Sequence, residues 1–343
     1  MLTIVSQQSN ALSDLLNEKG VLLADGATGT TLFDMGLTSG EAPELWNEQK
    51  PENIHKLHRD FVEAGADIIL TNSFGGTRHR LKLHNAQDRV HELNKLAAEI
   101  AREVAEAAGR KVIVAGSVGP TGELLVPLGA LTYEDAVSAF VEQMEGLKAG
   151  GADVIWIETM SSPEEIQAAA EAASKIAMPY VFTASFDTAG KTMMGLAPGA
   201  IHGVYSQFER KPLAVGANCG VGASDLLASI LDMTASDPNA VVVAKANCGI
   251  PVVKGDKVEY TGTPQTMSDY ACLAIDSGAR IIGGCCGTSC EHLSAMRKAI
   301  DNHPRGARPD LSAITESIGP MVNTTAGQND QAPRRERRGR RRA

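Results

Sequence analysis

The sequence predicts an α/β fold, a (β/α)8 TIM barrel that forms a single domain with a disordered basic C-terminal tail. Eight short runs rich in Val, Ile, Leu and Ala alternate with helix-like segments along the 343 residues, which is the pattern of βαβ units and a parallel sheet. A doubly wound sheet shows the same alternation. Eight units over roughly 250–300 residues are more typical of a barrel, which we therefore favour.

The expected strands are short and apolar, and amphipathic segments fill the connections between them. Several of these segments begin with Pro or Ser, as helices often do, and Gly65, Gly109, Gly151 and Gly278 follow four of them as helix C-caps would. The fifth connection, 197–208, has the weakest helical pattern. In chain order the strands are expected at 21–25, 67–72, 112–116, 153–157, 180–185, 214–218, 241–246 and 280–284, and the helices at 51–64, 87–108, 133–149, 163–176, 224–234, 264–276 and 290–300.

Composition sets the limits of the barrel. We expect residues 1–17 to be an N-terminal lead-in, residues 18–302 the barrel, and residues 303–343 a flexible Arg-rich tail. After Asn302 the sequence turns to Pro, Gly, Ser, Thr, Asn and Gln, a composition that cannot bury enough apolar surface to fold alone.

The charge is unevenly distributed. The chain has a formal net charge of −9, while residues 333–343 hold seven arginines and one glutamate, so the rest of the chain carries −15. An acidic body argues against a specific nucleic-acid partner. The arginines would give at most salt-sensitive, nonspecific nucleic-acid binding, and a solvated end is the simpler interpretation.

Apolar runs and cysteine usage bear on the compartment. The sequence has no run of 18 or more apolar residues and no N-terminal signal-peptide pattern, so we expect a cytoplasmic protein with no membrane partner. All six cysteines lie in the second half of the chain. In a cytosolic protein such clustering favours metal binding or catalysis over disulfides.

Three of the cysteines follow expected strands. In a barrel the active site is built at the C-terminal ends of the strands, so Cys219 after the sixth strand and Cys285 and Cys286 after the eighth can converge in the mouth. Three thiolates there predict a zinc site with one open position. Cys248 is a reserve ligand, whereas Cys272 and Cys290 are expected to be ordinary small buried residues, with a helix-start thiol as the minor alternative for Cys290.

Two acidic residues end other strands. A pair of carboxylates, here Asp25 and Glu158, commonly binds an ammonium group or does acid–base work in a barrel mouth, and beside thiolate-bound zinc we favour the ammonium group of an amino acid. The run Asp25–Thr30, which contains Gly26 and Thr28, is not a Walker motif because it lacks the lysine. Its backbone amides can instead hold a carboxylate.

These residues resemble the homocysteine S-methyltransferase family. The resemblance covers roughly residues 18–302 and is carried by Gly216-Ala217-Asn218-Cys219, by Gly283-Gly284-Cys285-Cys286-Gly287-Thr288 and by the run Asp25–Thr30. The chain is most similar to bacterial proteins described as betaine–homocysteine S-methyltransferases, through the segments Ala42–Trp46 and Leu83–Gln87. Gly75 and Thr159 stand where the animal betaine enzymes carry tyrosines, which leaves the methyl donor open.

The resemblance implies the roles of individual residues. It places zinc on Cys219, Cys285 and Cys286, which would also be the catalytic residues. It implies that Asp25 and Glu158 bind the amino group of homocysteine. Three further positions correspond to residues near the metal or in the pocket, namely Asn247, Thr71 and Phe74.

The function that we expect is zinc-dependent transfer of a methyl group from glycine betaine to homocysteine, giving methionine and dimethylglycine. A quaternary ammonium donor would rest against aromatic faces, and only 4% of residues are aromatic; Trp46 and Phe74 are the first candidates. The alternatives are a sulfonium donor, either dimethylsulfoniopropionate or S-methylmethionine, and a methylcorrinoid protein partner. Association into homo-oligomers stays open. The histidines form no His-x-x-x-His pair, which argues against a zinc hydrolase.

Overall fold

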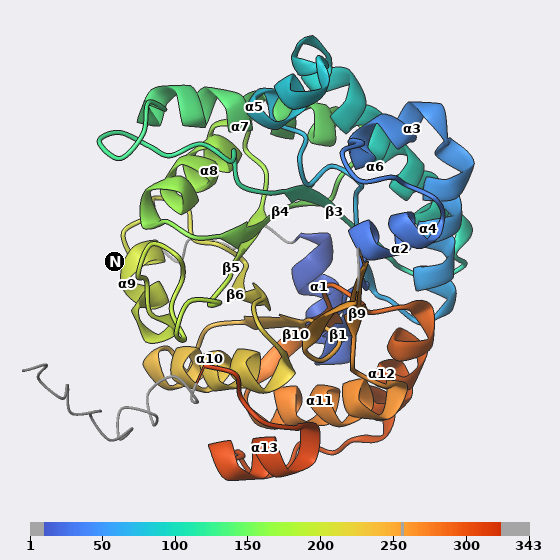
Figure 1. The fold of residues 1–343 in the computed structure, drawn as a ribbon, viewed down its shortest axis with the longest axis vertical. Helices are drawn as coiled ribbons and strands as arrows, with labels where there is room; N and C mark the ends of the chain where they lie inside the picture. Colours follow the sequence, from blue (N-terminus) through green and yellow to red (C-terminus); the bar gives the residue numbers. More distant parts are fainter. Residues whose placement is uncertain (1–9, 255–256, 324–343) are drawn as a thin grey trace, which may run out of the picture.

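The structure, a computed structural model, describes residues 10–254 and 257–323. Within this part of the chain, parallel strands stand at the centre and helices surround them (Figure 1). The eight barrel strands are β1 (Leu22–Leu23), β2 (Ile68–Leu70), β3 (Ile113–Val118), β4 (Val154–Met160), β5 (Tyr180–Ala184), β6 (Ala214–Cys219), β7 (Val242–Ala246) and β10 (Ala279–Gly284). Their order in the sheet is β1-β10-β7-β6-β5-β4-β3-β2. The predicted α/β barrel is confirmed.

Contacts between β1 and β2 close the sheet into a barrel. Ala24 forms a parallel bridge with Ile68, and the Asp67 amide donates a 2.6 Å hydrogen bond to the Leu23 carbonyl. No edge is therefore left between the first and second strands, as closure requires.

The helices lie where the amphipathic segments were expected. Thr132, Ser162 and Thr263 cap three of them by accepting the amide hydrogen of the third residue onward, because the first amides of a helix have no partner inside it. The helices are α1 (Ala11–Lys19), α2 (Thr28–Asp34), α3 (Trp46–Gln49), α4 (Pro51–Glu63), α5 (Arg78–Leu81), α6 (Val90–Ala107), α7 (Tyr133–Ala149), α8 (Pro163–Lys175), α9 (Ile201–Tyr205), α10 (Ala223–Ser236), α11 (Pro264–Asp276), α12 (Cys290–Asn302) and α13 (Leu311–Ile318), with 3-10 turns η1 (Pro43–Leu45), η2 (Lys82–His84), η3 (Gln87–Arg89) and η4 (Pro198–Ala200).

The hydrophobic core has an inner and an outer part. The outer part fills the space between the strands and the ring of helices. The inner part fills the barrel, where Trp156 packs among the aliphatic residues of the strands, and the apolar face of α1 joins it through Leu12, Leu15 and Leu16. Helix α1 thus plugs the end of the barrel at which the strands begin, and the opposite end is left for the site.

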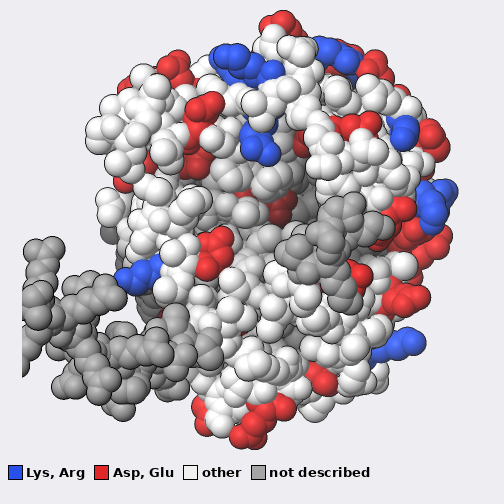
Figure 2. All heavy atoms as spheres, in the orientation of Figure 1, with Lys and Arg blue, Asp and Glu red and all other residues white. Residues whose placement is uncertain are grey.

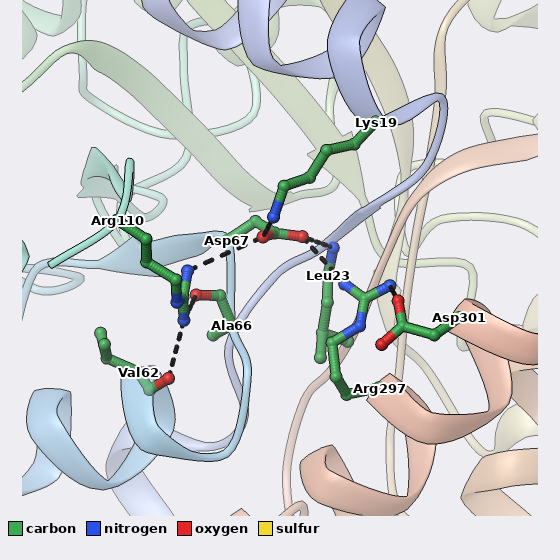
Figure 3. A network of polar contacts seen from close by, with 8 residues as sticks. All are labelled: Lys19, Leu23, Val62, Ala66, Asp67, Arg110, Arg297 and Asp301. Atoms are coloured by element: carbon green, nitrogen blue, oxygen red, sulfur yellow. Dashed lines mark hydrogen bonds and ion pairs between the residues drawn. The ribbon is translucent and has the colours of Figure 1, made fainter. Parts of the chain in front are cut away.

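A buried carboxylate at the plugged end fastens α1 to the barrel. Asp67 is 1% exposed and accepts hydrogen bonds from the Leu23 amide at 3.0 Å, from Lys19 at 2.6 Å and from Arg297 at 3.0 Å, while Arg110 lies 3.8 Å away (Figure 3). One carboxylate therefore joins α1, β1 and α12, and each of these cations offsets part of the cost of burying it.

Two segments differ from the sequence predictions. Residues 303–323 were expected to belong to the flexible tail, but they contain α13, whose Ile314 is buried, and Asp225 accepts hydrogen bonds from the amides of Val322 and Asn323. The error arose because a single apolar helix face is hidden in a polar composition. An antiparallel hairpin, β8 (Pro251–Lys254) and β9 (Lys257–Tyr260), was not predicted.

The remaining expectations concern the weak fifth connection, the Arg-rich end and the membrane. The fifth connection forms only η4 and the short α9. The arginines of 334–342 lie outside the described residues. Among the described helices, none combines the length and the apolar character that crossing a membrane requires.

Candidate active site

A cavity of about 450 Å³ opens at the end of the barrel where the strands terminate. Figure 2 shows this face, with the surface hollowed at its centre and acidic atoms inside the hollow. The volume is in the range of small-molecule sites. Residues from β1, β2, β4, β6, β7 and β10 or from the loops after them line it, including Asp25, Gly26, Thr28, Thr71, Phe74, Glu158, Lys245 and the three cysteines 219, 285 and 286.

The three predicted cysteines converge in this cavity. The Cys219 sulfur lies 3.1 Å from that of Cys285 and 3.8 Å from that of Cys286, and all three sulfurs lie within 4.8 Å of one another. The ligands of a tetrahedral zinc ion with bonds of about 2.3 Å are separated by about 3.8 Å, whereas disulfide sulfurs are about 2.05 Å apart. The arrangement fits a metal ion and not a disulfide.

The backbone of Cys219 is held in a costly conformation. Its φ of 60° lies in the left-handed region, which costs a non-glycine residue roughly 1–3 kcal/mol and is typical of functional sites. Thr159, at the end of β4, has a φ of 62°. Asn218 connects the two, because its side chain accepts a hydrogen bond from the Thr159 amide at 2.8 Å and donates one to the Thr159 hydroxyl at 2.7 Å.

The chemistry of the donors also fits a divalent cation. Hydrogen bonds from Cys219 and Cys285 lower the pKa of Cys286 to about 3, and sharing those hydrogens raises the pKa of Cys219. The three sulfurs therefore do not ionise independently, because a negative charge on one of them opposes a charge on its neighbours. A soft divalent cation such as zinc would neutralise the repulsion that prevents all three from ionising.

Two further side chains hold the cysteine loops in place. Asn247 accepts a hydrogen bond from the Cys286 amide at 3.0 Å and donates one to the Gly220 carbonyl at 2.8 Å, so it ties the loop after β10 to the loop after β6. Tyr260, on the unpredicted hairpin, packs against Gly287, the residue after Cys286, and contributes to the lowered pKa of the Cys286 thiol. Such contacts orient metal ligands.

One wall of the cavity is acidic. Glu158, at the end of β4, is 8% exposed, and one of its oxygens accepts a 2.5 Å hydrogen bond from the Ser117 hydroxyl. Burial raises the pKa of Glu158 to about 7, although the nearby Lys245 ammonium acts in the opposite direction. The carboxylate is therefore poised to ionise near neutral pH and to gain from a cation placed beside it.

Asp25 is occupied by a partner that the sequence analysis did not identify. Its Oδ1 lies 2.6 Å from the Lys245 Nζ, and its Oδ2 accepts a 2.7 Å hydrogen bond from the Leu70 amide. Asp25 and Lys245 are 1% and 2% exposed. Burial would lower the pKa of Lys245, but the charges of Asp25 and Glu158 outweigh it and raise that pKa, so the pair is ionic.

An aromatic ring and charged groups also line the cavity. Phe74 is 38% exposed and lines the cavity together with Glu44, Arg80 and His84. Glu44 accepts a 2.6 Å hydrogen bond from the Gly75 amide. A Cβ on Gly75 would lie 2.9 Å from the Glu44 carboxylate, so a side chain at this position would displace that carboxylate.

The expected site residues divide into those that line the cavity and those that do not. Asn247 supports the cysteine loops as described. The prediction that Trp46 contacts the methyl donor is wrong, because its side chain is 1% exposed and does not line the cavity. The Lys50 ammonium lies 3.9 Å from its ring centroid. Cys248, the reserve ligand, is buried outside the thiol cluster.

Sequence reasoning missed Lys245, Ser117, Glu44 and Arg80. The signal for Lys245 was present, since a single lysine interrupts the apolar strand Val241–Ala246 and a charge inside a buried strand requires a partner. No local pattern marked Glu44, in the 3-10 turn η1, or Arg80, in the short helix α5.

Comparisons with known proteins agree with this geometry. A family model described as homocysteine S-methyltransferase matches residues 22–300. The methionine synthases of Mycobacterium tuberculosis and Mycobacterium leprae are 31% and 30% identical over 334 and 328 residues, which is 90% and 87% of this chain. The chain spans about a quarter of the length of these curated relatives, 27% and 26%.

Solved structures show the same fold. The homocysteine methyltransferase MmuM from Escherichia coli, in its oxidised and metallated forms, is 25% identical to this chain with TM-scores of 0.71 and 0.70. Each alignment covers 84% of this chain and 99% of the solved chain.

Proposed function

The chain belongs to the homocysteine S-methyltransferase family, and we propose that it transfers a methyl group from glycine betaine to homocysteine with zinc held by Cys219, Cys285 and Cys286. The products are methionine and dimethylglycine. The observation that carries the proposal is a single cavity lined both by three converging thiols and by an exposed aromatic ring with charged groups.

The cysteine cluster supports the zinc dependence. The sulfur separations and the ionisation of the cluster fit a tetrahedral ion with one open position. A zinc ion bound there would lower the pKa of a fourth thiol, that of homocysteine, so that a thiolate is present at neutral pH. The protein then needs no general base for the transfer itself.

The rest of homocysteine fits the walls near the cluster. Its ammonium group faces the acidic wall that contains Glu158 and Asp25. Its carboxylate faces the backbone of Gly26 and Thr28, which lines the cavity at the start of α2. A Cβ on Gly26 would meet the Thr288 carbonyl at 2.4 Å, so only glycine lets this segment pack against Thr288.

The aromatic and charged residues that line the cavity favour glycine betaine as the donor. A quaternary ammonium group is attracted to an aromatic face, which Phe74 supplies, and to the carboxylate of Glu44. The carboxylate of betaine would form an ion pair with the guanidinium of Arg80, which lines the same cavity. In the transfer the homocysteine sulfur bonds to the methyl carbon while the N–CH3 bond breaks, and its electron pair stays on the nitrogen of dimethylglycine. Holding both substrates in one cavity supplies much of the acceleration.

A second candidate donor is a methyl group carried by another protein. The methionine synthases that this chain resembles are more than three times its length, and a partner could supply what the remainder of such a protein supplies. A small sulfonium donor, dimethylsulfoniopropionate or S-methylmethionine, would use the same aromatic and acidic groups.

A methyl-transfer assay with homocysteine and a panel of donors tests these assignments. Methionine is measured with glycine betaine, with each sulfonium and with no donor, on zinc-loaded wild type and on Cys285→Ala. Cys272→Ala is the matched control, since Cys272 lies on α11 away from the cluster. We expect methionine from betaine, loss of activity and of bound zinc in Cys285→Ala, and neither loss in Cys272→Ala. Methionine from a sulfonium alone would reject betaine, and full activity of zinc-free Cys285→Ala would reject the zinc site.

A further inference from the structure

We propose that Lys245 is a specificity-determining positioning residue, which occupies the Asp25 carboxylate so that Glu158 alone binds the ammonium group of homocysteine. The inference rests on the proposed binding of homocysteine and changes the role of Asp25, which the family resemblance gives to the ammonium group. Lys245 acts through Asp25 and not by contact with the substrate.

The geometry around Asp25 leaves little room for a second cation to bind its carboxylate. Each carboxylate oxygen already has a donor, the Lys245 ammonium at 2.6 Å and the Leu70 amide at 2.7 Å. Lys245 also lies 3.3 Å from the Asp25 backbone carbonyl, so two of its three hydrogens are directed to this residue. A carboxylate has further lone pairs, but a substrate ammonium that reached them would lie beside the buried charge of Lys245 and be repelled by it.

The geometry around Glu158 is different. Ser117 donates to one of its oxygens at 2.5 Å, and no other donor among the described residues reaches the carboxylate. The side chain lines the cavity and is 8% exposed, compared with 1% for Asp25. Glu158 therefore offers the cavity an acceptor whose charge has no ion-pair partner in contact with it.

The charge balance of the acidic wall agrees with one ammonium site. Two carboxylates and one lysine give a net charge of −1, and one substrate ammonium brings the wall to neutrality. Two carboxylates without the lysine would leave a buried charge uncompensated after binding, which is costly in a protein interior. Lys245 thus sets the number of cations that the wall accepts.

The test measures selectivity for the ammonium group. The dissociation constants of homocysteine and of 4-mercaptobutanoate, which is homocysteine without its amino group, are measured by calorimetry on zinc-loaded protein at pH 8.5. The selectivity ratio, the dissociation constant of 4-mercaptobutanoate divided by that of homocysteine, is compared among wild type, Glu158→Gln, the double variant Asp25→Asn/Lys245→Ala and the double variant Glu158→Gln/Lys245→Ala. A fraction of unfolded protein affects both ligands equally, so the ratio reports recognition and not folding.

We expect Glu158→Gln to reduce the ratio at least about tenfold, the size of a charge-assisted hydrogen bond, and removal of the Asp25–Lys245 pair to leave it within about threefold of wild type. In Glu158→Gln/Lys245→Ala part of the selectivity should return, because Asp25 is then free to accept the ammonium.

Two results would overturn the role of Lys245. One is a loss of selectivity in Asp25→Asn/Lys245→Ala as large as that in Glu158→Gln, and the other is no recovery in Glu158→Gln/Lys245→Ala. Failure of the proposed function has a different signature, since wild type would then bind neither thiol ligand.

Discussion

Glu158 should make the folded protein less stable as the pH rises through neutrality. Burial raises its pKa from the ordinary value of 4.5 to about 7. Below pH 4.5 the side chain is protonated in both the folded and the unfolded states and has no effect. Between pH 4.5 and 7 the unfolded chain releases the proton while the folded protein keeps it, so stability falls with rising pH, and above pH 7 the loss is complete.

The size of the effect follows from the two pKa values. Each pKa unit corresponds to about 1.4 kcal/mol, so the ionised side chain costs the folded state about 3 kcal/mol. Between pH 5 and pH 8.5 the free energy of unfolding of Glu158→Gln should therefore rise by roughly 2–3 kcal/mol relative to wild type. The comparison between the two proteins removes the contribution of other titrating groups.

Urea denaturation at the two pH values measures this difference, with both proteins in the same metal state and without substrate. Glu106→Gln is the matched control, because it makes the same chemical change at an exposed position of α6, outside the acidic wall. If Glu158→Gln changed stability equally at pH 5 and pH 8.5, the raised pKa of Glu158 and the acidic wall built on it would be refuted.

Three other perturbations test separate parts of the structure. Asp67→Ala should lower the free energy of unfolding by about 3 kcal/mol, since it leaves buried donors and partly buried cations unpaired. The control Asp60→Ala, which removes only a pair with Lys56 four residues away, should cost under about 0.5 kcal/mol. Equal losses in the denaturation curves of the two variants would contradict the role of Asp67 in fastening α1 to the barrel. Ala177→Gly should stabilise the protein by about 0.5–1 kcal/mol, because Ala177 has a φ of 58° that glycine adopts without strain. Gly151→Ala, at a φ of 94° after α7, should destabilise it by about 1 kcal/mol. Thermal melts in which both variants change stability in the same direction would contradict the left-handed conformation of these two residues. Removal of zinc by a chelator should lower the melting temperature of wild type but not of Cys286→Ser, as expected for a ligand of the folded state alone, and an unchanged wild-type melt would argue against the metal.

The barrel and the thiol cluster could be predicted because they depend on local patterns. Strand and helix periodicities are written in consecutive residues, and parallel strands around a barrel bring all their C-terminal ends to one mouth. Chain order was therefore enough to place Cys219 beside Cys285, although 66 positions separate them. The same argument placed Asp25 and Glu158 in the cavity.

The rest was decided by tertiary contacts. Whether Trp46 faced a donor or the core depended on how α3 packs, and the ring is buried. The apolar face of α13 is too short to outweigh its polar surroundings in the sequence, and α13 is ordered because α10 and α11 cover it.

The sequence by itself determined which residues reach the mouth of the barrel, because side-chain direction and strand order follow from local periodicity. Only the tertiary structure decided which of these residues are already paired. Lys245 neutralises Asp25 across 220 positions of the chain, and Asn218 holds Thr159 and Cys219 in strained conformations. Such pairings depend on how distant segments are placed to within a few tenths of an ångström, because hydrogen bonds and ion pairs in a buried site weaken steeply with separation and angle.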